Sequence, residues 1–429
     1  MKTIAFKTLG CRVNLFETDA LASRFKAGGY EVVDAGEADI FVVNTCTVTN
    51  TSDQKCRQAI HQIRRKNPEA LLVVTGCMVN HRKEELIQSG IADYVIDNER
   101  KSAIFDIVEE HFSKGQSDPE GYDRDLFCYQ PAFDTFHTRS LIKIHDGCNN
   151  FCSYCIIPMV RGRSTSRPAE DIYHNVREVV AHGFKEIVLT GVNMGRYHDG
   201  DTHFESLVEN IINIKGDFRV RVSSIEPDQF SDPFLQLFQH EKLAPHMHIC
   251  LQSGSEDTLK RMHRFYTVEQ FREMCHRIKS IRPDFNLTTD IIVGFPGESE
   301  ETFQESCDFA REIGFSHIHT FKYSKRTGTK AASMPDQVPE NVKTLRSEVM
   351  RRISLENKLK YFEQMKGTTQ RLLIERIDAK GMARGYGENY IPIQIPAQKL
   401  ERNTFIDVVL NEIINTENED KMMYKAAIR

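Results

Sequence analysis

A regular alternation of strand-like and helix-like segments in the middle of the chain limits the folds that it can adopt. Six apolar segments with strand character follow one another, separated by helical stretches: Leu141–Ile144, Glu186–Thr190, Phe218–Ser223, His246–Leu251, Asn286–Val293 and His317–Phe321. The clearest helical stretches are Ala169–Ala181, Val268–Ile281 and Glu300–Ile313. Six consecutive units of this kind predict a parallel, partly closed barrel. In such barrels the chemistry takes place at the carboxyl ends of the strands.

Residues 1–125 show the same alternation and predict a separate parallel α/β domain. Its strand candidates are Thr3–Phe6, Tyr30–Val33, Ile40–Val43, Leu71–Thr75 and Tyr94–Ile96. Three helices are expected. The first is Phe16–Ala27, the second begins at a cap formed by Thr51 or Ser52 and runs to Arg65, and the third is Ala103–Phe112. The polar stretch Asp118–Pro131 indicates a linker. The barrel domain is then expected to span residues 135–365.

In the tail, residues 366–429, apolar and polar residues alternate with a period of two. Four segments alternate as strands do: Thr369–Glu375, Ile391–Ile395, Phe405–Leu410 and Met422–Ile428. Turns are expected at residues 379–381 and 385–387, and an amphipathic helix over Asn341–Met365 joins the tail to the barrel domain. Four or five short strands predict a small antiparallel β-barrel of the kind that binds oligonucleotides. A purely structural role for this barrel is the alternative.

The amino-acid composition excludes few classes of function. The formal net charge of the 429 residues is −5, so bulk charge does not indicate a nucleic-acid binder, although a local basic patch could still act as one. No apolar run is long enough to span a membrane and no signal peptide is evident, so we expect a cytoplasmic protein. In that reducing compartment the 11 cysteines are expected to be metal ligands or buried thiols rather than disulfides.

Cys148, Cys152 and Cys155 form a C-x₃-C-x₂-C run directly after the first barrel strand. Such a loop can fold three thiolates around one metal centre. Structural zinc sites normally have four protein ligands, which makes zinc the less favoured interpretation. A [4Fe–4S] cluster held by three thiolates keeps one iron open for a small molecule.

A second set, Cys11, Cys46 and Cys77, is spread over the first domain. Each of these cysteines lies just past an apolar strand and before a helix. The carboxyl ends of parallel strands meet at one edge of a sheet, so the three thiols are expected to converge. One such cysteine alone would be interpreted as a small buried hydrophobe, whereas three at equivalent positions predict a site. Cys56, Cys128, Cys250, Cys275 and Cys307 have no such spacing and are expected to be structural, and no histidine pair indicates a metal site.

The turns after the barrel strands are rich in Gly, Ser and Asn, residues that allow close approach to a ligand but that turns also favour in general. They are Thr190–Asn193, Ser223–Pro227, Gln252–Ser255, Gly294–Glu298 and Tyr323–Thr329. After the cysteine loop, Arg161, Arg163 and Arg167 occur without any acidic residue between them, which favours either phosphate binding or a solvated loop.

Together these motifs resemble the MiaB-like radical SAM methylthiotransferases over essentially the whole chain. The resemblance rests on the cysteine loop, on residues 8–14, 44–50 and 74–77 around the first-domain cysteines, and on Gly387–Pro392, which is similar to the RNA-binding TRAM domain. It departs at Thr327, where relatives often have Pro. The resemblance implies an α/β N-terminal domain, a partial (βα)₆ radical SAM barrel and a TRAM barrel.

The same resemblance implies the cofactors and their ligands. Two [4Fe–4S] clusters are expected, one on Cys148, Cys152 and Cys155 and an auxiliary one on Cys11, Cys46 and Cys77. S-adenosylmethionine is expected to contact Tyr154, Gly191, Asn193, Ser223, Ser224, Glu226, Gln252 and Gly294. The three arginines are expected to contact RNA.

The implied activity is methylthiolation at carbon 2 of N6-threonylcarbamoyladenosine, beside the anticodon of tRNA. It requires a radical because that C–H bond is unactivated. The implied partners are the tRNA anticodon stem-loop, a flavodoxin-like or ferredoxin-like electron donor and a sulfur source. Alternatives are the same chemistry on N6-isopentenyladenosine or on an aspartate of a ribosomal protein, an iron–sulfur RNA-binding regulator without turnover, and a zinc RNA-binding protein.

Overall fold

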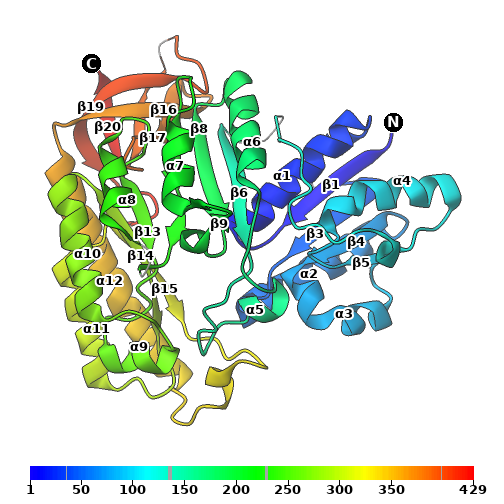
Figure 1. Cartoon of the computed structure of the whole chain (residues 1–429), viewed down its shortest axis with the longest axis horizontal. Helices are drawn as coiled ribbons and strands as arrows, with labels where there is room; N and C mark the ends of the chain where they lie inside the picture. Colours follow the sequence, from blue (N-terminus) through cyan, green and yellow to red (C-terminus); the bar gives the residue numbers. More distant parts are fainter. Residues whose placement is uncertain (35, 134–137, 228–229, 398) are drawn as a thin grey trace.

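The computed structural model describes residues 1–34, 36–133, 138–227, 230–397 and 399–429. Its first part is a parallel sheet with the order β2-β1-β3-β4-β5 and helices on both faces, as predicted (Figure 1). The strands are β1 Thr3–Thr8, β2 Glu31–Val33, β3 Ile40–Thr45, β4 Leu71–Gly76 and β5 Tyr94–Ile96. The helices are α1 Arg12–Ala27, α2 Asn50–Lys66, α3 Cys77–Ser89 and α4 Ile104–Lys114. Every residue of β3 and β4 is buried, because helices cover both faces of a parallel sheet.

The cap of α2 differs from the prediction. The residue that caps this helix is Thr49, whose side chain accepts a hydrogen bond from the Ser52 backbone N–H. Thr49 has the extended backbone of an N-cap, whereas Thr51 and Ser52 already lie inside the first turn. The helix therefore begins at Asn50, only four residues after Cys46.

The middle part forms the predicted partial barrel. Its strands are β6 Arg139–Asp146, β8 Glu186–Gly191, β11 Arg219–Val222, β12 Ser224–Ile225, β13 His246–Ile249, β14 Asn286–Val293 and β15 His317–Lys322. Hydrogen bonds join them into two groups, β11-β8-β6 and β12-β13-β14-β15, and all these pairs are parallel. Ser223 alone separates β11 from β12, so we count these two as one interrupted strand. The described part of the barrel then has six strands. The predicted domain start at residue 135 lies outside the described residues.

Helices cover the outer face of these strands, and the main apolar core lies between the two layers (Figure 1). Three of them, α6 Ala169–Ala181, α10 Val268–Ile281 and α11 Glu300–Ile313, have the predicted bounds. The remaining helices and short strands are α5 Ile157–Val160, β7 Thr165–Ser166, β9 His198–Asp199, β10 Thr202–His203, α7 Phe204–Ile212, α8 Asp232–Gln236 and α9 Glu256–Met262. Short 3₁₀ turns lie at Lys101–Ala103, Pro119–Gly121, Met194–Arg196, Leu237–Gln239 and Lys330–Ser333.

The long helix α12, Glu340–Met365, leads into a closed five-stranded barrel with the order β16-β17-β18-β20-β19. The strands are β16 Thr369–Ile377, β17 Met382–Tyr386, β18 Pro392–Pro396, β19 Phe405–Ile414 and β20 Met423–Ile428. The predicted barrel is confirmed, with one difference in pairing: β18 and β20 run parallel. The turn predicted at residues 385–387 is wrong in part, because Gly385 and Tyr386 belong to β17. A Cβ at Gly385 would lie 1.7 Å from the Leu373 carbonyl oxygen, so this strand position requires glycine.

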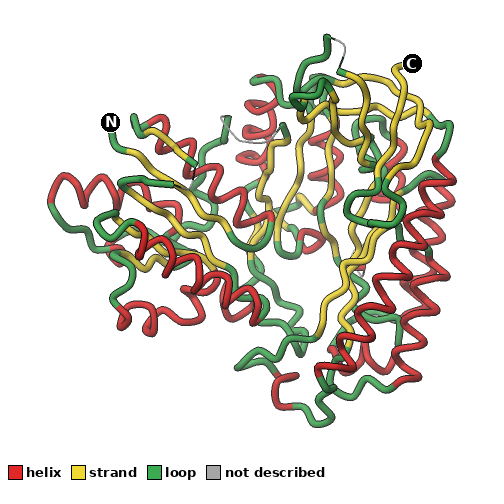
Figure 2. The backbone as a smooth tube through the Cα atoms, turned by 180° about the vertical axis from the view of Figure 1, so that it is seen from behind, coloured by secondary structure: helices red, strands yellow, loops and turns green. Residues whose placement is uncertain are grey.

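The parts pack against one another. Seen from behind, the strands of the partial barrel lie between the N-terminal sheet and the layer of long helices (Figure 2). Helix α1 contacts β6 and β8, while α12 lies along β15 and reaches the terminal barrel. The connection after α4 is irregular, and its Tyr129 packs edge-on against Phe16, 5.5 Å between ring centroids. Within the described ranges, no helix is both long and apolar enough to cross a membrane.

Candidate active site

All six predicted ligand cysteines line one cavity of about 1150 Å³ between the N-terminal sheet, the partial barrel and the terminal barrel. Cys11, Cys46 and Cys77 come from the N-terminal domain, and Cys148, Cys152 and Cys155 come from the loop after β6. Sequence separation between the two sets reaches more than a hundred residues, so the fold itself brings them together.

The loop that carries Cys148 is shaped by its backbone. Gly147 has a φ of 67°, and a Cβ there would lie 1.9 Å from the Arg163 carbonyl oxygen. Only glycine fits such a position. The Cys148 N–H donates to the Gly162 carbonyl oxygen (3.2 Å), and the Cys155 N–H donates to that of Cys152 (2.9 Å). The chain thus folds back on itself and presents three thiols to one side.

Hydrogen-bond donors surround the sulfur atoms of this loop. The Asn150 N–H and the Asn193 side-chain amide donate to Cys148 Sγ at 3.4 and 3.6 Å. The Arg264 guanidinium donates to Cys152 Sγ at 3.2 Å and pairs with Glu226. Burial raises the pKa of the Cys155 thiol to about 12. Thiols in such a place remain protonated unless a metal centre binds them, and the donors suit the thiolate form.

The second set lies at the sheet edge that the sequence predicted. Cys11 precedes α1, Cys46 follows β3, and Cys77 is the first residue of α3. Electrostatic repulsion from the Cys77 sulfur contributes to the raised pKa values of both Cys11 and Cys46, after desolvation as the main cause. The thiols therefore converge. Cys56 is buried instead, with its sulfur 3.3 Å from the backbone oxygen of Cys46, in the structural position expected for it.

Contacts join the two sets. Cys77 packs against Ile156, which directly follows Cys155, and against Val160, the last residue of α5. The Asn98 side-chain amide donates to Cys77 Sγ (3.8 Å) and to the Val160 carbonyl oxygen (3.0 Å). Asn98 thus couples the N-terminal site to the helix that leaves the cysteine loop.

A buried charge network lies behind both sets. Glu17 of α1 pairs with Lys101, with Lys143 of β6 at 2.9 Å and with Arg161 at 3.2 Å. Asp146 pairs with Lys143 at 2.6 Å and with Arg161 at 2.8 Å. Three cations face two carboxylates, which leaves one net positive charge. Despite burial, the Arg161 guanidinium and the two lysines hold the pKa of Glu17 well below its usual range.

The predicted RNA contacts of two arginines are not supported. Arg161 belongs to the buried charge network, and its side chain is 1% exposed. Arg167 is also buried, and it donates to the Asn175 side-chain oxygen at 3.0 Å. Both guanidinium groups are buried and engaged by protein partners in this structure. Arg163 is exposed and stacks on the Phe151 ring at 4.5 Å, so it alone of the three stays available to RNA.

The predicted S-adenosylmethionine contacts divide into two groups. Six of the eight residues line the cavity: Tyr154, Gly191, Ser223, Ser224, Glu226 and Gln252. Asn193 lies behind Cys148, with its Oδ1 atom buried and without a hydrogen-bond partner among the described residues. Gly294 does not reach the wall, because its N–H donates to Glu298 at 2.7 Å and the Lys343 side chain covers it. Arg264, which pairs with Glu226, was missed, since no local motif marks it.

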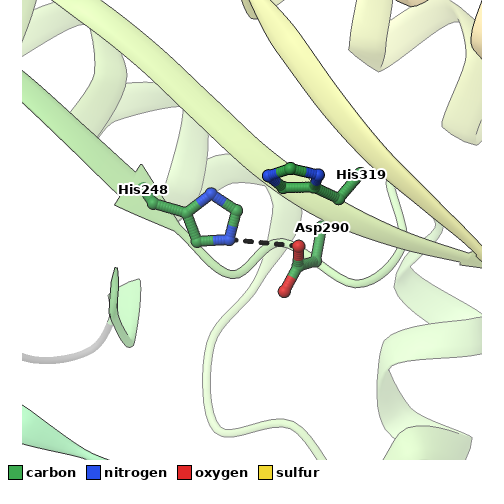
Figure 3. A group of neighbouring side chains, drawn as sticks. All are labelled: His248, Asp290 and His319. Atoms are coloured by element: carbon green, nitrogen blue, oxygen red, sulfur yellow. Dashed lines mark ion pairs between the residues drawn. The ribbon is translucent and has the colours of Figure 1, made fainter. Parts of the chain in front are cut away.

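His248, Asp290 and His319 form a further group on the cavity wall that the sequence analysis missed. Their donor atoms lie within 4.8 Å of one another, and His248 Nε2 pairs with Asp290 at 3.1 Å (Figure 3). His319 Nδ1 lies 3.1 Å from His317 Nε2, whose ring also contacts Glu419. Burial lowers the pKa of His319 to about 4, so this ring is neutral at pH 7. Polar residues at every second position of β13, β14 and β15 were the available signal, because alternate side chains share one face.

Comparison with known proteins gives the following matches. Residues 3–97 match the uncharacterized protein family UPF0004, and residues 142–310 match the radical SAM superfamily. The chain is 40% identical over 410 residues, covering 92% of this chain and 90% of the relative, to a threonylcarbamoyladenosine tRNA methylthiotransferase MtaB of Bacillus subtilis (strain 168). It is 35% identical to a tRNA-2-methylthio-N(6)-dimethylallyladenosine synthase of Pelotomaculum thermopropionicum, covering 91% of this chain and 90% of the relative.

Among solved structures, the chain resembles TsrM, a radical S-adenosylmethionine methyltransferase from Kitasatospora setae with cobalamin and a [4Fe–4S] cluster bound. The TM-score is 0.56 with 16% identity, covering 77% of each chain. At this identity the likeness supports the fold alone.

Proposed function

The chain belongs to the family of MiaB-like radical SAM methylthiotransferases, and on that premise we propose that it transfers a methylthio group to carbon 2 of N6-threonylcarbamoyladenosine, next to the anticodon in tRNA. The observation that carries the proposal is the single cavity that six cysteines from two domains line. Sulfur insertion needs a radical source and a sulfur source within reach of one C–H bond, and one shared cavity meets that need.

Both cysteine sets fit a [4Fe–4S] cluster held by three thiolates. Each set offers three sulfur atoms, which leaves one iron open. Hydrogen-bond donors to Cys148, Cys152 and Cys77, together with the net positive charge of the buried network, stabilise thiolates at these positions. When bound, the cluster on Cys148, Cys152 and Cys155 would supply the electron that cleaves S-adenosylmethionine, and the cluster on Cys11, Cys46 and Cys77 would supply the sulfur.

The S-adenosylmethionine site is proposed on the cavity wall beside the cysteine loop. Asn193 is proposed to support this wall from behind, since its side-chain amide donates to Cys148 Sγ at 3.6 Å and to the Asn150 side-chain oxygen at 3.3 Å. Ser223, Ser224, Glu226 and Gln252 offer hydroxyl, carboxylate and amide groups for the rest of the molecule. Arg264 fixes Glu226 and donates to Cys152, which makes it a positioning residue of this site.

The three domains are proposed at residues 1–125, 135–365 and 366–429, with the last one as the RNA-binding module. Its residues Tyr386, Tyr390 and Arg384 line the cavity, so an RNA held by the terminal barrel would lie over the cysteines. The proposed partners are the tRNA anticodon stem-loop, a low-potential electron donor and a sulfur source, and the proposed location is the cytoplasm.

The relative that acts on dimethylallyladenosine supports a second candidate, the isopentenyl-type substrate, with the same chemistry. Mass spectrometry of tRNA nucleosides from cells with and without the gene tests both. Loss of the 2-methylthio derivative of threonylcarbamoyladenosine, with accumulation of the parent nucleoside, is the expected result. Loss of the isopentenyl derivative instead would select the second candidate, and no change in either nucleoside would refute the proposed activity.

A further inference from the structure

Arg12 is a positively charged residue whose place in the fold has no structural explanation. It is half-buried, and it is the first residue of α1, where the helix already carries partial positive charge. The first turn of α1 holds no acidic residue. Within the described ranges Arg12 makes no hydrogen bond or ion pair, although it lines the large cavity. A cation in this position is unfavourable for the helix, which points to a role toward a ligand.

Most of the other arginines on the same cavity wall have acidic partners; the exception within the described ranges is Arg376, which is exposed on the terminal barrel. Arg161 pairs with Glu17 and Asp146, Arg264 pairs with Glu226, and Arg139 pairs with Glu375. The effect of Arg12 reaches across the cavity. Burial and Arg221 are the main causes of the lowered pKa of His246, and Arg12 adds to them. Burial raises the pKa of Tyr390, but Arg139 and, after it, Arg12 outweigh burial and lower that pKa.

Arg12 also lines a second, smaller cavity of about 400 Å³. Five arginines and one carboxylate, that of Glu375, face this space; the arginines are Arg12, Arg139, Arg221, Arg376 and Arg402. Leu15, Leu141 and Val188 supply its apolar wall. Arg139 and Arg221 are neutralised in part by Glu186, at 3.6 and 3.1 Å. Arg12 therefore stands where the cysteine-lined cavity meets a small, cationic and partly apolar one.

Resting on the proposed function, we propose that this small cavity binds the N6 substituent of the target adenosine and that Arg12 pairs with the carboxylate of its threonine. The chemistry matches, because a threonylcarbamoyl group carries one carboxylate on a short, partly apolar chain. An isopentenyl group carries no charge. Arginine is suited to carboxylate recognition through its two parallel N–H donors. Arg12 would then decide between the two candidate substrates.

The test uses the full-length holoenzyme and synthetic anticodon stem-loops that differ only at one adenosine. Its N6 substituent is threonylcarbamoyl, the uncharged amide of threonylcarbamoyl, or isopentenyl. Equilibrium binding and methylthiolation are both measured. The wild type is expected to bind the carboxylate about 10- to 100-fold more tightly than the amide, the usual worth of a charge-assisted hydrogen bond. Arg12→Gln should remove most of that difference, and Arg12→Lys should restore part of it.

The matched control is Arg65→Gln, which removes the same charge from an exposed position of α2 outside both cavities. It should behave as the wild type. Thermal stability and iron content should be unchanged in Arg12→Gln, which excludes a role in folding or in holding a cluster.

Two results would overturn the inference. One is a wild type that binds the carboxylate and the amide equally. The other is an Arg12→Gln variant that loses the same factor on all three RNAs, which would assign Arg12 to the phosphate backbone. Failure of the proposed function is distinguishable, because it shows in the wild type as methylthiolation of the isopentenyl RNA and not of the threonylcarbamoyl RNA.

Discussion

The two cysteine sets offer the same ligands but are built by different means. Cys148, Cys152 and Cys155 lie within eight residues, and the shape of one loop, with glycine at position 147, brings them together. Cys11, Cys46 and Cys77 span 67 residues and meet only because β1, β3 and β4 end at one edge of a sheet. The first set depends on local backbone geometry, whereas the second depends on the fold of a whole domain and on its contact with the barrel.

The largest expected effect separates the two sets by function. Cys152→Ala should reduce both S-adenosylmethionine cleavage and methylthiolation to background. Cys46→Ala should leave cleavage active and abolish methylthiolation, because it disturbs only the sheet-edge set. Liquid chromatography of 5′-deoxyadenosine and of modified nucleosides measures both activities. Cys275→Ala, a change at a buried cysteine of α10, is the control for loss of a thiol alone. Full methylthiolation by Cys46→Ala would refute the role of the second set.

The next effect tests the contact between the domains. Glu17→Gln leaves Lys101, Lys143 and Arg161 without their shared partner, and breaking such a buried ion pair typically costs about 3–5 kcal/mol of the free energy of unfolding. Thermal denaturation measures this loss, and the exposed Glu84→Gln is the control. The site formed by Cys11, Cys46 and Cys77 should lose iron before the site formed by Cys148, Cys152 and Cys155 does. A variant with unchanged melting temperature would show that this network does not hold the domains together.

The stability of the folded protein should depend on pH through His145, which lies three residues before Cys148. Its Nδ1 accepts a hydrogen bond from the Asn193 N–H (3.3 Å) and its Nε2 lies 2.8 Å from the Ser164 hydroxyl, so the ring is neutral. Burial lowers its pKa from 6.5 to about 4. Below pH 6.5 the unfolded chain therefore binds a proton that the folded protein does not, and stability is lost as the pH falls from 6.5 toward 4.

For one fully buried histidine this shift corresponds to about 3 kcal/mol of stability. Denaturant unfolding at pH 7.5 and 5 should show a smaller difference in His145→Gln than in the wild type. His182→Gln, at an exposed position, is the control and should keep the full pH dependence. Equal dependence in His145→Gln and in the wild type would contradict the prediction.

The smallest effect concerns the helix after Cys46. Thr49→Ala removes the N-cap of α2 and should cost about 1 kcal/mol of stability. Thr51→Ala, within the same turn but exposed, should cost much less. Urea denaturation of both variants measures the difference. A larger loss of stability in Thr51→Ala than in Thr49→Ala would show that Thr51, one of the two residues predicted from the sequence, caps the helix.

The sequence predicted those parts of the molecule whose signals are local. Helices α6, α10 and α11 carry clear apolar periodicity, and their predicted bounds agree with the structure. The convergence of Cys11, Cys46 and Cys77 was predictable because strand ends in a parallel sheet share an edge. Strand β17 was hidden, since the glycines at 385 and 387 are typical of a turn. Only the neighbouring strand explains the glycine at 385, because the Leu373 carbonyl occupies the space of a side chain.

Burial of charged residues was the main information that the sequence lacked. Arg161 and Arg163 are the same residue type two positions apart. Arg161 lies in a buried network with Glu17, 144 positions away, whereas Arg163 is exposed. The pairing of Arg264 with Glu226 is likewise nonlocal. A basic run in a sequence gives its charge but not the partners that tertiary contacts provide.

The parallel pairing of β18 with β20 ties the terminal barrel to the cavity. Parallel neighbours cannot be joined by a tight hairpin, so the chain leaves β18, forms β19 beside β16, and turns back to place β20 beside β18. Glu419, which contacts His317 on the cavity wall, lies in the loop between β19 and β20. The loop that closes the terminal barrel therefore also supports the wall of the cysteine-lined cavity, and a change in that loop would reach the cavity.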